Sequence, residues 1–109
     1  MMPLIKFEDF KKLDLKTAKV LKVDDHPNAD KLYVLTVGVG DSEKKIVAGI
    51  KPYYKPEELF GRMVIIIDNL EPANIRGVES CGMLLAAKDD KTLAILAPDK
   101  GISEGSRVS

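Results

Sequence analysis

The pattern of hydrophobic and polar positions predicts a chain built mostly of short strands. Four segments are rich in β-branched or aromatic residues: 17–24, 31–39, 44–50 and 62–69. The stretches between them contain Gly, Pro, Asn or Asp, and such an arrangement is typical of strands joined by turns. The fourth segment is the strongest, because positions 63–67 are continuously apolar.

Two short helices are also expected. Residues 7–13 place apolar side chains at helical spacing and predict a leading helix. Pro56 suits the first position of a second helix, Glu57 and Glu58 favour its positive end, and Gly61 can close it.

The last third of the chain predicts a hairpin. Its arms are 82–88 and 91–97, joined at Asp89–Asp90. Residues 71–77, which contain Pro, Asn and Gly, are expected to form a loop.

Together these elements predict a single all-β domain over residues 1–109, with no repeat or linker. A helix between the third and fourth strands favours a five-stranded OB-fold Greek-key barrel, although an SH3-like barrel would give a similar pattern. The segment 63–67 is apolar on both faces. One face can lie inside the barrel, so the other must be covered by the chain ends or by a partner, which favours a homodimer.

The charge balance argues against a uniformly basic nucleic-acid binder. Seventeen basic residues match seventeen acidic ones, whereas proteins that bind phosphate backbones are usually basic. Residues 1–24 and 42–62 each carry a net charge of +2. A local basic face is therefore possible, although lysines along strand edges also serve solubility.

Few residues are available for catalysis or metal binding. The only histidine is His26 and the only cysteine is Cys81, so no His or Cys pair has zinc-ligand spacing and no cofactor is expected. A lone cysteine suits a reducing cytosol and is expected to be buried. No signal peptide or membrane-length apolar run is present, so we expect a soluble cytoplasmic protein without enzymatic activity.

Three longer strings carry more information. They are HPNADKLY at 26–33, YKPEELFG at 54–61 and NLEPANIRGVESCGMLLAA at 69–87. In order and spacing they resemble the tRNA-binding domain family, and the similarity extends from FEDF at 7–10 to the end of the chain. That family includes the C-terminal domain of many bacterial methionyl-tRNA synthetases and free-standing structure-specific tRNA-binding proteins.

The resemblance implies an OB barrel, homodimerisation through the chain ends and recognition of the tRNA corner by shape. It predicts a non-catalytic tRNA-binding subunit or C-terminal domain that raises tRNA affinity for methionyl-tRNA synthetase in trans. Because the chain begins with Met1 and ends where the family ends, a separate polypeptide is expected, with an excised domain as the alternative. The rival functions are a homodimeric peptide-binding chaperone and a purely structural dimerisation domain.

The same resemblance names four candidate tRNA-binding residues: Lys31, Arg76, Ser80 and Met83. Lys31 and Arg76 would contact phosphates, and Arg76 could instead pair with Glu79 or Asp68. Ser80 could bond a phosphate or 2′-hydroxyl, and Met83 could pack on a base or sugar. The family often has a basic residue between the proline and the Arg-Gly pair, where this chain has Ala73 and Asn74.

Tyr33, Tyr53 and Tyr54 could stack on bases or pack inside the barrel.

Overall fold

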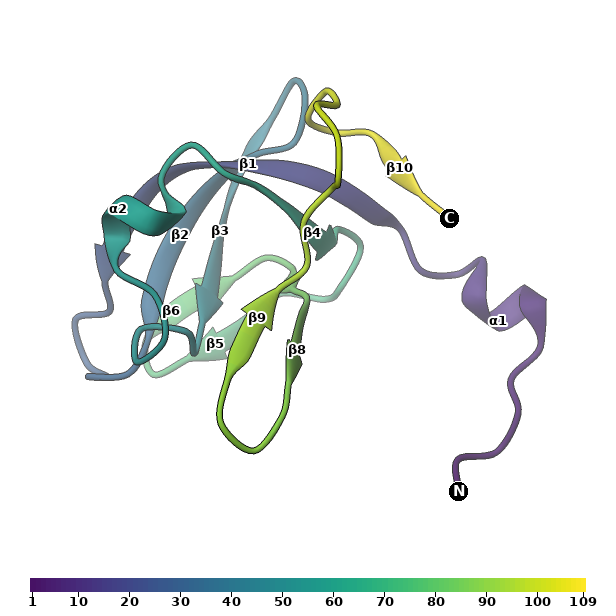
Figure 1. Cartoon of the computed structure of the whole chain (residues 1–109), viewed down its shortest axis with the longest axis horizontal. Coiled ribbons are helices and arrows are strands. Elements are labelled where there is room, and N and C mark those ends of the chain that lie inside the picture. The colour runs from purple at the N-terminus through teal and green to yellow at the C-terminus, as the bar shows by residue number, and fades with distance from the viewer.

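One long bent strand organises the molecule. In the computed structural model, which describes residues 1–109, this strand is β1 (Leu15–Asp25), seen crossing the upper part of Figure 1. The helices are α1 (Phe7–Phe10) and α2 (Pro56–Leu59). The other strands are β2 (Tyr33–Gly38), β3 (Glu43–Ala48), β4 (Met63–Ile67), β5 (Ala73–Ile75), β6 (Val78–Ser80), β7 (Met83–Leu84), β8 (Ala86–Lys88), β9 (Leu93–Ile95) and β10 (Arg107–Val108).

The strands form an antiparallel barrel in the order β3-β2-β1-β4-β7. The first half of β1 pairs with β4, and the part from Lys19 onward pairs with β2, with a register shift between Val20 and Lys22. Such a bulge bends a strand and increases its twist. One strand can therefore belong to both walls, as the OB-fold requires.

Hydrogen bonds from β3 to the last residue of β6 and to the residue after it bring the open edges together. The Cys81 backbone N–H donates to the Lys45 carbonyl at 2.8 Å, and the Val47 backbone N–H donates to Ser80 Oγ at 3.0 Å. Gly82 fits here because a Cβ atom would lie 2.8 Å from the Ile67 carbonyl oxygen and its φ is +136°. Only glycine tolerates both conditions.

The core lies inside this barrel. Alternation along the strands directs every second apolar side chain inward, so that in β4 Val64 and Ile66 are fully buried. Leu59 of α2 is also fully buried. It joins Leu35 and Ile46 in the same cluster, and α2 thus contributes one side chain to the core.

The C-terminal segment is bound to β1 around the buried Thr17. Thr17 Oγ1 donates to the Ser103 carbonyl at 2.8 Å and accepts from the Ser106 N–H at 2.9 Å. By contrast, α1 and the residues before it lie away from the barrel in Figure 1. Neither helix is long and apolar enough to cross a membrane.

The predicted fold is confirmed: an OB barrel with short helices before the first strand and between the third and fourth. The expected loop at 71–77 is wrong in part, because it contains β5 and half of a β5–β6 hairpin. The leading helix is shorter than 7–13, since Leu13 and its neighbours leave the helix to meet β1.

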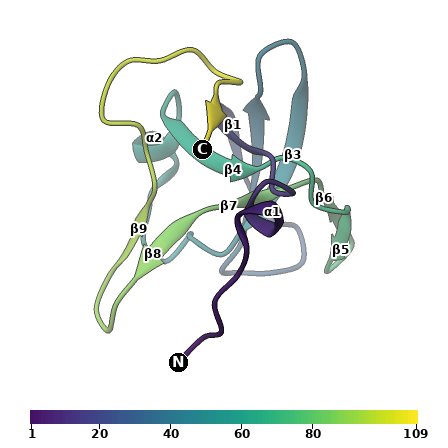
Figure 2. The same ribbon diagram turned by 90° about the vertical axis from the view of Figure 1, so that its right-hand side faces the viewer.

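The predicted 82–88 arm divides into β7, which pairs with β4, and β8, which pairs with β9. The β8–β9 hairpin itself is confirmed. Figure 2 shows the β5–β6 and β8–β9 hairpins projecting from opposite sides of the barrel.

Candidate nucleic-acid interface

Lys31 and Arg76, which are distant in sequence, line the same surface hollow. Lys31 belongs to the loop between β1 and β2, and Arg76 to the turn between β5 and β6. The hollow has a volume of about 430 Å³, and both side chains are exposed. Two of the four predicted contact residues therefore lie together on a face that is open to a ligand.

The turn that carries Arg76 has an unusual backbone. Arg76 and Gly77 connect the paired residues Ile75 and Val78, and their φ angles are +53° and +96°. Two consecutive positive φ values define the type I′ hairpin turn, whose first position strongly prefers Asn, Asp or Gly. An arginine in this conformation costs about 1–2 kcal/mol. Strained residues of this kind cluster at functional sites.

Asn74 stabilises this turn. Its Oδ1 accepts from the Gly77 backbone N–H at 2.9 Å, which is an Asx-type bond that a lysine or arginine side chain is unable to make. Asn74 thus gives the turn a bond that a basic side chain at the same position would not supply.

Five lysines are held in ion pairs with carboxylates elsewhere in the fold. They are Lys12, Lys16, Lys22, Lys44 and Lys51. Lys31 and Arg76 are in no such pair. The alternative partners expected for Arg76 are occupied elsewhere: Asp68 binds two lysines, and Glu79 contacts Cys81 Sγ at 3.6 Å. Both cations of the hollow are free to meet an anion, although Asp30 shares the hollow and opposes them.

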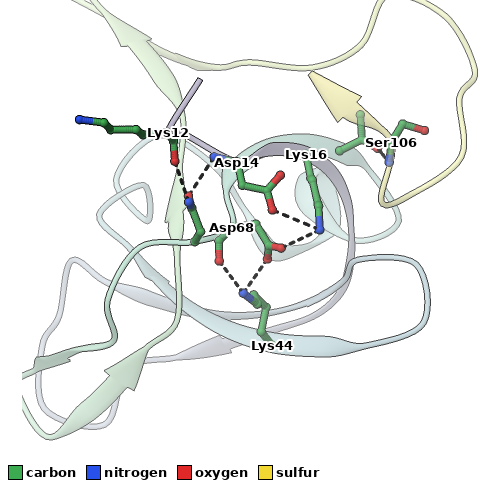
Figure 3. A network of polar contacts seen from close by, with 8 residues as sticks. Lys12, Asp14, Lys16, Lys44, Asp68 and Ser106 are labelled. Atoms are coloured by element: carbon green, nitrogen blue, oxygen red, sulfur yellow. Dashed lines mark hydrogen bonds and ion pairs between the residues drawn. The ribbon is translucent and has the colours of Figure 1, made fainter. Parts of the chain in front are cut away.

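Asp68 is the centre of the largest polar network (Figure 3). It lies 2.6 Å from Lys44 Nζ and 3.0 Å from Lys16 Nζ, and Lys44 also donates to the Asp68 carbonyl at 3.0 Å. Burial alone would raise the pKa of Asp68, but the two lysines outweigh it and hold the pKa below its usual value. The network joins β1, β3 and the end of β4, so its role is to stabilise the barrel.

The other two predicted residues, Ser80 and Met83, differ in exposure and in location. Ser80 is buried, with an exposed fraction of 3%, and its Oγ accepts from the Val47 N–H and donates to the Gly82 carbonyl at 3.3 Å. Met83 is 49% exposed and lines a separate apolar hollow of about 290 Å³ between the end of β3 and β7–β9. The structure thus brings Lys31 and Arg76 together, while Met83 lies elsewhere.

Two of the three tyrosines are used for packing. Tyr33 is buried and its hydroxyl donates to the Tyr54 carbonyl at 2.7 Å, while the Tyr54 hydroxyl accepts from the Ile95 N–H at 3.1 Å. Tyr53 is exposed, with Lys88 Nζ 5.8 Å from its ring centre.

Two residues of the site were not singled out from the sequence: His26 and Asn28, which hydrogen-bond the Arg76 turn. The HPNADKLY string contains both, but attention fell on the lysine because it is the one residue of the string with a fixed positive charge. No group of three His, Cys, Asp or Glu side chains is placed to hold a metal ion.

Comparison with known proteins assigns this chain to a family. Residues 15–107 match the family model described as "Putative tRNA binding domain". The methionine–tRNA ligase of Thermococcus kodakarensis is 55% identical over 107 residues, which is 98% of this chain and 14% of that protein. This chain therefore spans about one seventh of such relatives.

Solved structures agree with that match. The crystal structure of a MetRS-related protein from Pyrococcus horikoshii has a TM-score of 0.92 and 34% identity, and covers 99% of this chain and 100% of that one. The CsaA chaperone protein from Picrophilus torridus has a TM-score of 0.91 and 29% identity, with coverage of 97% and 100%. The family model, the identity and the fold agree, and the chain belongs to the tRNA-binding domain family.

Proposed function

We propose that this chain is a non-catalytic module that binds tRNA. The observation that carries the proposal is the juxtaposition of Lys31 and Arg76, two exposed cations without ion-pair partners, in one hollow of a tRNA-binding-family barrel. A-form RNA hides the base edges of its deep groove, so proteins read its phosphates, 2′-hydroxyls and exposed loop bases. Two fixed cations at a barrel surface suit that kind of recognition.

The four candidate residues take different roles in this proposal. Lys31 and Arg76 bind phosphates, the latter through the planar fork of its guanidinium. Met83 packs against a sugar or base, because it is half exposed at the edge of an apolar hollow. Ser80 acts indirectly: its hydroxyl holds the segment immediately before Met83 through the Gly82 carbonyl.

The module is proposed to act as a homodimer through its chain ends. Met1, Met2, Leu4, Ile5 and Phe7 are all highly exposed, which is unfavourable for an isolated molecule. A hollow of about 490 Å³ lies between α1 and β10, lined by Phe10 and Val108 among others. A two-fold partner would cover this apolar surface.

The relatives support a synthetase partner. They are methionine–tRNA ligases of which this chain spans a small part, so we propose that the module raises the tRNA affinity of that enzyme. Size-exclusion chromatography of the chain, alone and with methionyl-tRNA synthetase, tests both assemblies. A Phe7→Ser variant that remains the same size as the unmodified chain would contradict the proposed interface.

Titration of labelled tRNA by fluorescence anisotropy tests the main proposal. Binding should weaken steeply as salt rises, because cations that neutralise phosphates release bound counterions. A duplex RNA of similar length is the control, and it should bind more weakly. Equal affinity for the duplex, or affinity independent of salt, would contradict the proposal.

A peptide-binding chaperone is the second candidate. It is favoured by the likeness to the CsaA chaperone and by the hollow at Met83, whose lining is apolar except for Gly49. Burial of apolar side chains depends little on salt screening. An unfolded polypeptide that binds with salt-independent affinity and competes with tRNA would favour this function.

A further inference from the structure

The histidine of the chain is buried beneath the Arg76 turn. His26 Nε2 lies 2.8 Å from the Ile75 carbonyl oxygen, and His26 Nδ1 lies 2.9 Å from the Asn28 backbone nitrogen. A carbonyl can only accept and a backbone N–H can only donate. His26 therefore carries its proton on Nε2 and keeps a lone pair on Nδ1, which describes the neutral ring in one tautomer.

Asn28 makes the second connection to the same turn. Its Nδ2 donates to the Arg76 carbonyl at 3.0 Å. The carbonyls on both sides of the Arg76 Cα, those of Ile75 and Arg76, are thus held by residues of the loop that carries Lys31.

These bonds answer a specific need of the turn. Arg76 has φ +53°, a conformation that persists only where the surroundings enforce it. Its own hairpin supplies the Asn74–Gly77 bond and only a short strand pairing, since β5 and β6 have three residues each and are largely exposed. A relaxed turn would move the guanidinium relative to Lys31, and the site would lose its preorganisation.

We propose that His26 and Asn28 are positioning residues: they join the Lys31 loop to the Arg76 turn so that both cations meet the RNA backbone in a fixed arrangement. This inference rests on the proposed phosphate-binding role of Lys31 and Arg76. His26 is buried and acts only through Arg76, with no contact to RNA.

Salt dependence provides a readout that a general loss of stability would not change. His26→Asn keeps an acceptor near the position of Nδ1 but removes the donor to Ile75. This variant removes no charge, yet it should behave like Arg76→Ala. Each should weaken tRNA binding about five- to eight-fold at about 0.1 M salt and lower the slope of log K against log salt by about 0.7 to 0.9.

Two further variants complete the test on the full chain. His26→Gln, whose amide nitrogen reaches the position of Nε2, should recover much of both the affinity and the slope. His26→Asn combined with Arg76→Ala should bind no more weakly than Arg76→Ala alone, because both changes remove the same contact.

The outcomes separate this inference from the proposed function. If Arg76→Ala weakens binding but His26→Asn binds like the unmodified chain, or weakens binding with an unchanged slope, the positioning role is wrong and the site stands. If Arg76→Ala changes neither quantity, the site itself is wrong and the inference falls with it. Should His26→Asn fail to fold, Asn28→Ala decides, because Asn28 is exposed and the same loss and slope are expected from it.

Discussion

Replacing both Lys31 and Arg76 with alanine should remove two phosphate contacts without disturbing the barrel. Both side chains are exposed and neither is in an ion pair. Exposed substitutions of this kind usually change stability by less than about 0.5 kcal/mol. A change in tRNA affinity would therefore report on contact with RNA rather than on folding.

The magnitude follows from the number of contacts. Each phosphate contact contributes about 0.7 to 0.9 to the slope of log K against log salt, depending on the charge density of the nucleic acid. At about 0.1 M salt, one contact then raises the affinity about five- to eight-fold relative to about 1 M salt. Two contacts raise it about 25- to 60-fold. The double variant should lose this factor, and its salt slope should fall by about 1.4 to 1.8.

Anisotropy titrations with labelled tRNA over a range of salt concentrations measure both quantities. A variant with Arg62→Ala and Lys100→Ala is the matched control, because it removes one arginine and one lysine that are exposed, unpaired and outside the hollow. The reasoning is refuted if the double variant binds like the unmodified chain. It is refuted equally if the control loses as much affinity, since the effect would then be one of total charge.

Met83→Ala should weaken tRNA binding while leaving the salt slope unchanged, because it removes an apolar contact; a lowered slope in the same titrations would contradict that role. Asp30→Asn should tighten binding at low salt by removing the carboxylate from the hollow, so weaker binding would instead identify Asp30 as an RNA contact. Ser80→Ala should lower the free energy of unfolding in urea by about 1–3 kcal/mol by leaving the Val47 N–H without its partner, and an unchanged midpoint would refute this. The pKa of Asp68 is depressed in the folded state, so its contribution to stability is present above the usual carboxyl pKa of 3.8 and is lost as the pH falls through the folded value. Asp68→Asn should therefore reduce stability at neutral pH. It should also flatten the acid-dependent part of the curve of melting temperature against pH.

The sequence was most informative where local pattern and tertiary environment agree. The continuous apolar run of β4 predicted a strand with residues buried on one face, and Pro56 marked the start of α2. The β5–β6 hairpin was missed because Pro72, Asn74 and Gly77 are turn formers and each strand has only three residues. A type I′ turn with arginine at its first position has no sequence signal, because that position usually holds Asn, Asp or Gly and the residue that binds the Arg76 carbonyl lies in a distant loop.

The site residues show the same division. Lys31 and Arg76 were found through the family strings, yet their proximity depends on the barrel bringing together loops 45 positions apart in the sequence. Ser80 lies in the same string as Arg76, but its hydroxyl accepts a hydrogen bond from β3, which closes the barrel against it. Side chains whose partners are non-local are the ones that sequence reasoning assigns least well.

The neutral total charge illustrates why a sum over the sequence is a weak guide to binding. Five lysines pair with carboxylates, and Asp68 alone holds Lys16 and Lys44 where they stabilise the barrel. Lys31 and Arg76 share their hollow with one carboxylate, that of Asp30, so the local charge is +1 although the total is zero. An arginine also occupies a turn position where asparagine would be less strained. That position exchanges stability for a guanidinium at the mouth of the hollow, and such an exchange is understandable only if the guanidinium has something to bind.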